Sequence, residues 1–179
     1  MNRSLLMASS AVVLLVGCQA IPGESTDSFI PTNCEIPKVL SAFQQSITGA
    51  LFIPTDWQPA EDTDLFEVYE LGGIACTYGI ESAEIGGTLM WAKVSDDFWR
   101  QKVDKWETLG YLKVDVPELN ESDAFALSTT AADDVPVWLI NLELDGVWIQ
   151  FGASKFVASL DDARAILKAA ASAIEAERP

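Results

Sequence analysis

Residues 137–151 have the sequence VWLINLELDGVWIQF, which carries the strongest structural information in the chain. Two runs of alternating apolar residues flank Asp145-Gly146, a dipeptide typical of a two-residue type I′ hairpin turn. Such a turn fixes the register of both strands, so one side of the hairpin is expected to face the core. The facing pairs form an apolar set (Leu144 with Val147, Leu142 with Ile149, Ile140 with Phe151) and a mixed set (Glu143 with Trp148, Asn141 with Gln150).

Apolar residues at helical spacing predict three helices elsewhere in the chain. The first covers residues 36–48, the second begins after Ser95 and ends at Gly110, and the third begins after Ser159 and ends near residue 176. Ser95 and Ser159 are suited to N-caps, and Asp162 would complete a capping box with Ser159.

Further strands are expected at residues 64–70, 74–80, 88–94 and 124–129, with a short extended segment within 111–116. Gly72-Gly73 and Gly86-Gly87 are interpreted as the turns between the first three of them. The expected order is α-βββ-α-βββ-α, with the two βββ halves weakly alike in pattern. This order predicts a sandwich-like α+β fold in which three helices pack against one or more antiparallel sheets.

The N-terminus has the features of an export signal. Arg3 precedes an apolar stretch that is shorter than the roughly 20 residues needed to span a bilayer. The stretch ends in Leu15, Val16, Gly17 and Cys18, which resembles a bacterial lipobox in which the cysteine is acylated and becomes the new N-terminus. The alternative is an ordinary secretory signal with an incidental cysteine.

The lipobox divides the chain into three expected parts: a lipoprotein signal peptide at 1–17, a lipidated cysteine with a flexible tether at 18–33, and one domain at 34–179. Residues 19–33 are rich in Pro, Gly, Ser, Thr and acids, which is typical of a linker. The domain is therefore expected outside the cytoplasm, held by lipid at the outer face of the cell membrane.

Two cysteines, Cys34 and Cys76, remain once Cys18 is lipidated. An exported protein meets an oxidising environment, so the pair is expected to form a disulfide that pins the start of the first helix to a strand. Two buried free thiols are the alternative. A redox-active pair is disfavoured because the chain has no C-x-x-C motif.

The 179 residues include 27 acidic and 11 basic side chains, no histidine, and a formal net charge of -16. Removing residues 1–17 would make the charge one unit more negative, since Arg3 is their only charged residue. A nucleic-acid partner is excluded by the sign of the charge. The acidic surface either keeps an exported protein soluble or complements a basic partner.

The lack of histidine excludes imidazole metal sites and histidine-dependent triads, and no metal site, other cofactor or catalytic residue is expected. Carboxylates alone could perform acid–base chemistry, and a glycosidase would need two of them across a cleft. Calcium is disfavoured because no EF-hand loop motif is present. The adjacent acidic pairs are Asp96/Asp97, Asp133/Asp134 and Asp161/Asp162.

Flat aromatic side chains could bind a ligand by stacking. Trp99 and Trp106 share a helical stripe and Trp138 lies on the apolar hairpin side, so these three are expected in the core. Trp57, in a loop, and Trp148, on the mixed hairpin side, are the candidates for exposed binding aromatics.

Several of these features together resemble small secreted lipoproteins of actinobacteria that carry a domain of unknown function and, more distantly, the extracellular sensor domains of PknH-type kinases. The features are the lipobox, Cys34 before a helix, the segment Cys76-Thr77-Tyr78, the loop PELNESDAF at 117–125, and a hairpin followed by an alanine-rich helix. The chain has Tyr78 where the family more often has tryptophan, and its loop lacks the family's glycine. The resemblance implies binding or sensing in the cell envelope and supplies no catalytic residues.

The sequence therefore predicts a membrane-anchored, non-enzymatic lipoprotein that binds an unknown envelope protein or small ligand. A carboxylate-dependent enzyme acting on glycans or the cell wall is one alternative, and a structural envelope component is another.

Overall fold

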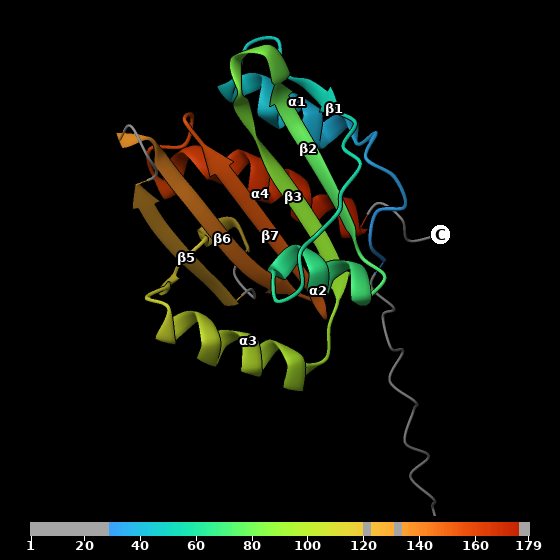
Figure 1. Ribbon diagram of the computed structural model, residues 1–179, viewed down its shortest axis with the longest axis vertical. Coiled ribbons are helices and arrows are strands. Elements are labelled where there is room, and N and C mark those ends of the chain that lie inside the picture. Colours follow the sequence, from blue (N-terminus) through green and yellow to red (C-terminus); the bar gives the residue numbers. More distant parts are fainter. Residues whose placement is uncertain (1–28, 120–122, 131–133, 176–179) are drawn as a thin grey trace, which may run out of the picture.

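The computed structural model describes residues 29–119, 123–130 and 134–175, which share one antiparallel sheet of seven strands with helices on both faces (Figure 1). The strands are arranged in the order β1-β2-β3-β7-β6-β5-β4. They are β1 (Leu51–Ile53), β2 (Ile74–Ile80), β3 (Ile85–Lys93), β4 (Leu112–Val114), β5 (Asp123–Thr130), β6 (Pro136–Leu144) and β7 (Val147–Ser154). The helices are α1 (Pro37–Ser46), α2 (Asp64–Glu70), α3 (Asp96–Thr108) and α4 (Leu160–Glu175), with short 3-10 turns η1 (Glu81–Ala83) and η2 (Pro117–Leu119).

The hairpin of β6 and β7 has the predicted register at every pair named from the sequence. Asp145 and Gly146 have φ values of 52° and 76°, as a type I′ turn requires. Both strands lie in the interior of the sheet, between β3 and β5. The register of the hairpin therefore determines which side chains of β6 and β7 point to each face of the sheet.

The apolar face of the hairpin packs beneath α1 and α4, which lie together on one side of the sheet (Figure 1). Phe43 of α1 contacts the rings of Tyr78 and Phe151 at centroid distances of 5.0 and 5.9 Å. Trp91 Nε1 donates a hydrogen bond to the carbonyl oxygen of Ala170 in α4, at 3.1 Å. This face carries the larger of the two clusters of buried side chains.

The other face of the sheet is covered by α2 and α3 near one end of the strands (Figure 1). Trp106 of α3 packs against Trp148 of β7 with ring centroids 5.7 Å apart, and both side chains are buried. Ser95 caps α3 as predicted, because its hydroxyl accepts a hydrogen bond from the amide of Phe98. Among the described residues, no α-helix covers the rest of this face.

The prediction of a strand at residues 64–70 is wrong, because these residues form α2. Thr63 caps this helix by accepting a hydrogen bond from the amide of Phe66. Leu65 and Val68, three residues apart, both pack against the sheet. Gly72, with a φ of 70°, then turns the chain into β2.

The described residues thus contain four α-helices where the sequence predicted three, and the order α-βββ-α-βββ-α is corrected accordingly. Gly86 and Gly87, interpreted as a turn, lie inside β3, and the turn is instead at η1 and Glu84, whose φ is 51°. β1 was not predicted. The α+β class, the antiparallel sheet and the predicted helices α1, α3 and α4 are confirmed.

Candidate functional site

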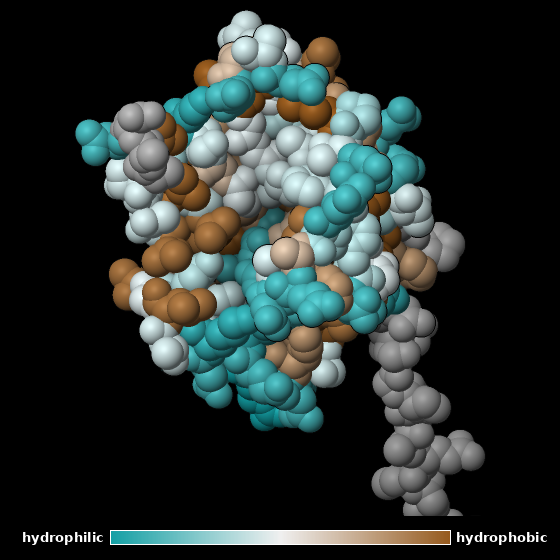
Figure 2. All heavy atoms as spheres, viewed as in Figure 1, coloured by the Kyte–Doolittle hydropathy of each residue, from teal (hydrophilic) through white to brown (hydrophobic). Residues whose placement is uncertain are grey.

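An open groove of about 560 Å³ lies on the face of the sheet that carries α2 and α3, beyond the part that these helices cover. Figure 2 shows this face, with a hollow near its centre. Residues of β2, β3, β6 and β7 line the groove together with Trp57, Leu65 of α2 and the η1 turn. Two other pockets among the described residues are smaller, at about 260 and 310 Å³.

Small side chains form the floor of the groove. One row of paired residues crosses the sheet here. Thr77 of β2 faces Thr88 of β3, Thr88 faces Gly152 of β7, and Gly152 faces Leu139 of β6. The hydroxyl oxygens of Thr77 and Thr88 are 3.1 Å apart and share a hydrogen bond. A Cβ atom on Gly152 would lie 3.3 Å from Leu139 Cδ2, so the glycine adds width to the hollow.

The walls of the groove are apolar. Ile53, Trp57 and Leu65 contribute from β1, the following loop and α2, while Val137 and Leu139 contribute from β6. All five side chains are only partly buried, so apolar surface remains available to a ligand. The groove thus offers apolar surface around a floor of hydroxyl groups and glycine backbone.

A buried polar network closes one end of the groove at Gln150. Gln150 Nε2 donates hydrogen bonds to Asp64 Oδ2 at 2.5 Å and to Asn141 Oδ1 at 2.7 Å. Trp148 Nε1 donates to the same Asn141 oxygen at 3.0 Å. These bonds join β6 and β7 to the first residue of α2, and so hold α2 beside the groove.

Lys102 of α3 provides the cation of this network. Its side chain is only 4% exposed, and its Nζ lies 2.5 Å from both Asp64 Oδ1 and Glu67 Oε2. The same Nζ lies over the rings of Trp106 and Trp148, at 5.2 and 4.9 Å from their centroids, in cation–π geometry. The network therefore fixes α3 to α2 and to the sheet.

Tyr111, which follows α3, lies near the same charges. Burial raises the pKa of its hydroxyl to about 12, and the negative charge of Asp64 contributes to the increase. Tyr111 is therefore neutral at physiological pH, and its ring packs against that of Trp106 with centroids 6.0 Å apart.

The charged residues that line the groove are Glu81 and Glu84, in and directly after η1. Both side chains are exposed. Lys155 Nζ lies 3.5 Å from Glu84 Oε2, and neither lysine nor arginine occurs among the described lining residues. The groove therefore has an acidic end and no lining base.

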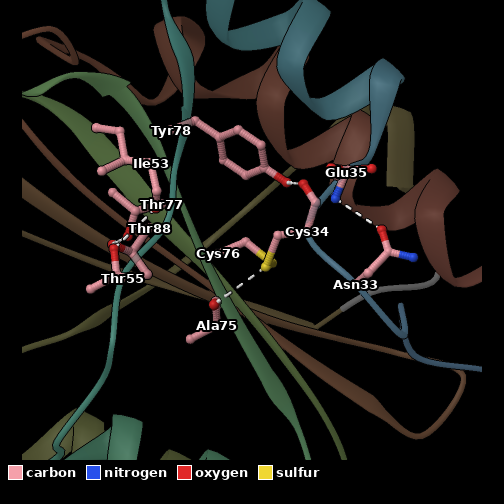
Figure 3. Close-up of a disulfide and its surroundings, with 10 residues drawn as sticks. All are labelled: Asn33, Cys34, Glu35, Ile53, Thr55, Ala75, Cys76, Thr77, Tyr78 and Thr88. Carbon is pink, nitrogen blue, oxygen red and sulfur yellow. Dashed lines mark hydrogen bonds between the residues drawn. A yellow bond between two sulfur atoms is a disulfide. The ribbon is translucent and has the colours of Figure 1, made fainter.

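The disulfide between Cys34 and Cys76 is present, with Cα atoms 5.4 Å apart (Figure 3). It joins the segment before α1 to β2, as the sequence predicted. The hydroxyl of Tyr78 donates a hydrogen bond to the carbonyl oxygen of Cys34 at 2.8 Å, and burial raises the pKa of that hydroxyl. Cys76 belongs to the cluster beneath α1 and α4, whereas its neighbour Thr77 faces the groove.

The two tryptophans proposed as exposed binding aromatics have different surroundings. Trp148 is completely buried under α3, so that prediction is wrong, because helices cover the mixed face of the hairpin as well as the apolar one. Trp57 is partly buried and lines the groove. Trp99 and Trp106 are buried as predicted, and Trp138 packs partly buried against the cluster beneath α4.

None of the described residues of the three acidic pairs lines the groove. Asp96 and Asp97 begin α3, where Asp97 pairs with Arg100, and Asp96 lines a separate pocket of about 260 Å³. Asp161 and Asp162 begin α4.

Asp162 forms one half of the predicted capping box: its carboxylate accepts from the Ser159 amide, whereas its own amide donates to the Ser159 carbonyl oxygen and not to the hydroxyl. Hydrogen bonds from the Ser159 hydroxyl and from the amides of Ala158 and Ser159 lower the pKa of its carboxyl group. Asp133 lies outside the described residues, and so do the four lipobox residues Leu15, Val16, Gly17 and Cys18.

The groove itself was not predicted. The residues of its floor were interpreted from the sequence only as parts of strands or turns, with no role in binding. The pairing of Thr77 with Thr88 and of Thr88 with Gly152 becomes visible only when β7 is placed beside β3. Small residues at alternate positions of several strands were the one indication in the sequence.

None of the helices in the described residues is sufficiently long and apolar to cross a bilayer. Within the same residues, no three side chains of His, Cys, Asp or Glu are grouped as metal ligands would be. Comparisons of the chain with protein-family models, with curated proteins and with solved structures found no match.

Proposed function

We propose that the protein is a membrane-anchored lipoprotein of the bacterial cell envelope whose domain binds a small, mainly apolar ligand without transforming it. The groove on the sheet is the observation that carries this proposal. Its volume of about 560 Å³ lies within the range of small-molecule sites, about 300–1,000 Å³. The lipobox supports the anchor, and the resemblance to secreted lipoproteins supports binding over catalysis.

The lining of the groove supports an apolar ligand. Trp57, Val137 and Leu139 present apolar surface from two sides of a floor made by threonine and glycine. Burial of apolar area contributes about 25 cal/mol per Å², so a ligand that loses about 200 Å² of apolar surface gains about 5 kcal/mol before the cost of association. Dissociation constants of about 0.2 mM or weaker are therefore expected for such a ligand, and the assay must detect them.

Replacing Thr88 by tryptophan is expected to abolish ligand binding by filling the groove. Thr88 lies on the floor between Thr77 and Gly152, and an indole there would occupy the space that a ligand needs. Titration with the neutral fluorescent probe N-phenyl-1-naphthylamine should show binding to the full-length Cys18→Ala chain. The Thr88→Trp variant should bind at least about tenfold more weakly, a loss of about 1.4 kcal/mol.

The matched control is Leu112→Trp, which adds an indole on edge strand β4, where Leu112 is 71% exposed. This variant should bind the probe as the parent does. The proposal fails if the parent does not bind the probe, or if Thr88→Trp retains binding while both variants unfold at the same denaturant concentration as the parent.

Replacing Cys18 by alanine is expected to release the protein from membranes, because the diacylglycerol acceptor is lost. Fractionation of cells should move the protein to the soluble envelope fraction, and labelling with an alkyne fatty acid should disappear. Cys34→Ala is a matched control that should keep both the label and the membrane fraction. Continued membrane retention and labelling of the Cys18→Ala chain would contradict the anchor.

A further inference from the structure

The charged groups around the groove are mostly acidic. Glu81 and Glu84 line one end, and the side chain of Lys155, which is 36% exposed, lies with its Nζ 3.5 Å from Glu84 Oε2. The loop of residues 54–63, which carries Trp57 into the wall, adds three exposed acids and contains no base. An occupant of the groove is therefore surrounded by more negative than positive charge.

The opposite end of the groove supplies no cation to balance these acids. Gln150 directs its amide nitrogen to Asp64 and Asn141. Lys102, the nearest base of the network, is 4% exposed and has both Asp64 and Glu67 within 2.5 Å. An anionic headgroup would thus have carboxylates near both ends of the groove, and the partly exposed ammonium beside the lining, that of Lys155, already lies against Glu84.

We propose that the ligand of this groove is a small cationic amphiphile, an amine whose apolar body lies between Trp57 and Leu139 and whose charged end lies beside Glu81 and Glu84. This inference rests on the proposed function and specifies the ligand class for the same groove. Charge complementarity supports it, because the lining combines apolar walls with carboxylates at one end. Fatty acids and other anionic lipids are therefore not the preferred ligands of the groove.

A series of ligands that share one apolar body and differ in charge tests the proposal. Octyltrimethylammonium and octyl sulfate, each below its critical micelle concentration, and octanol, below its solubility in water, would be titrated against N-phenyl-1-naphthylamine bound to the full-length Cys18→Ala chain. Two exposed ion pairs, each worth about 0.2–1 kcal/mol, should make the cation displace the probe about 2- to 30-fold more tightly than the alcohol. The sulfate should bind more weakly than the alcohol, and salt should reduce both differences.

The double variant Glu81→Gln/Glu84→Gln should bind octanol as the parent does and lose most of the preference for the cation. The control Asp104→Asn/Glu107→Gln removes two exposed acids from α3 and should keep that preference. If the probe and octanol bind but the cation binds no more tightly, or if Glu81→Gln/Glu84→Gln keeps the preference, the ligand class is wrong and the binding groove stands. If the probe and all three ligands fail to bind, the proposed function itself is wrong.

Discussion

Reduction of the disulfide between Cys34 and Cys76 is expected to lower the free energy of unfolding by about 4 kcal/mol. The bridge closes 42 positions of the chain, and cross-linking a loop of that length removes a corresponding amount of conformational entropy from the unfolded state. Urea denaturation of the Cys18→Ala chain, oxidised and reduced, measures the difference without any change of side-chain volume. A domain of this size is typically stable by about 5–15 kcal/mol, so the loss is a large share of the total.

The position of the bridge explains which part of the fold would loosen first. Cys34 lies in the segment before α1, and this segment reaches β2 through the disulfide and the hydrogen bond from Tyr78 to the carbonyl oxygen of Cys34 (Figure 3). Cys76 is fully buried, whereas Cys34 is only partly buried. Hydrogen exchange should therefore increase most in α1 and β2 after reduction.

The control for this prediction is the double variant Cys34→Ala/Cys76→Ala in the same Cys18→Ala background. It should be at least as unstable as the reduced protein, and reductant should not change its unfolding midpoint. Equal stability of the oxidised and reduced chains would contradict a stabilising cross-link. A midpoint that still shifts with reductant in the double variant would assign the effect to something other than this bridge.

Local chemistry explains the elements that could be predicted from the sequence. Asp145-Gly146 adopts the backbone angles of one turn type, and that turn fixes the pairing of β6 with β7 over the whole hairpin. Ser95 and Asp162 form cap hydrogen bonds within three residues along the chain, so they locate the starts of α3 and α4. Contacts this local do not depend on the rest of the fold.

A strand was wrongly predicted at α2 because seven residues are too few to distinguish the helical from the strand period of apolar side chains. Phe66, Val68 and Tyr69 favour a strand by propensity, although the apolar residues of the segment fall at helical spacing, in the pairs 65/66 and 68/69. The cap at Thr63, acids in the first helical turn and the glycines after residue 71 were the available indications of a helix. Packing against the sheet then overrides the intrinsic preference.

The environment of Trp148 and the groove depends on contacts that no local pattern encodes. The mixed face of the hairpin is buried at Trp148, where α3 covers it, and open at Gly152, four residues further along the same strand. Which part of a face is covered follows from where α2 and α3 pack. The apolar stripe of α3, which includes Trp99 and Trp106, was the one sign in the sequence that a second sheet face is covered.

Replacing Lys102 by methionine is expected to lower the free energy of unfolding by about 3 kcal/mol. Methionine keeps much of the apolar contact with the neighbouring rings but removes the ammonium that pairs with both Asp64 and Glu67. Breaking a buried ion pair by removing one partner costs about 3–5 kcal/mol, because the remaining charge is left uncompensated. The lower end of that range applies, since the side chains of Asp64 and Glu67 are 22% and 27% exposed and water can partly solvate them.

The control on the same helix is Lys105→Met. Lys105 is 48% exposed and its Nζ lies 3.9 Å from Glu67 Oε1, so its loss should cost less than about 1 kcal/mol. The triple variant Lys102→Met/Asp64→Asn/Glu67→Gln removes the stranded charges along with the cation and should recover much of the stability, as replaced buried ion pairs often do. Urea denaturation of all three variants separates the explanations. If Lys102→Met matches the parent, the carboxylates do not depend on the ammonium; if the triple variant is less stable than Lys102→Met, the loss comes from packing and hydrogen bonding and not from uncompensated charge.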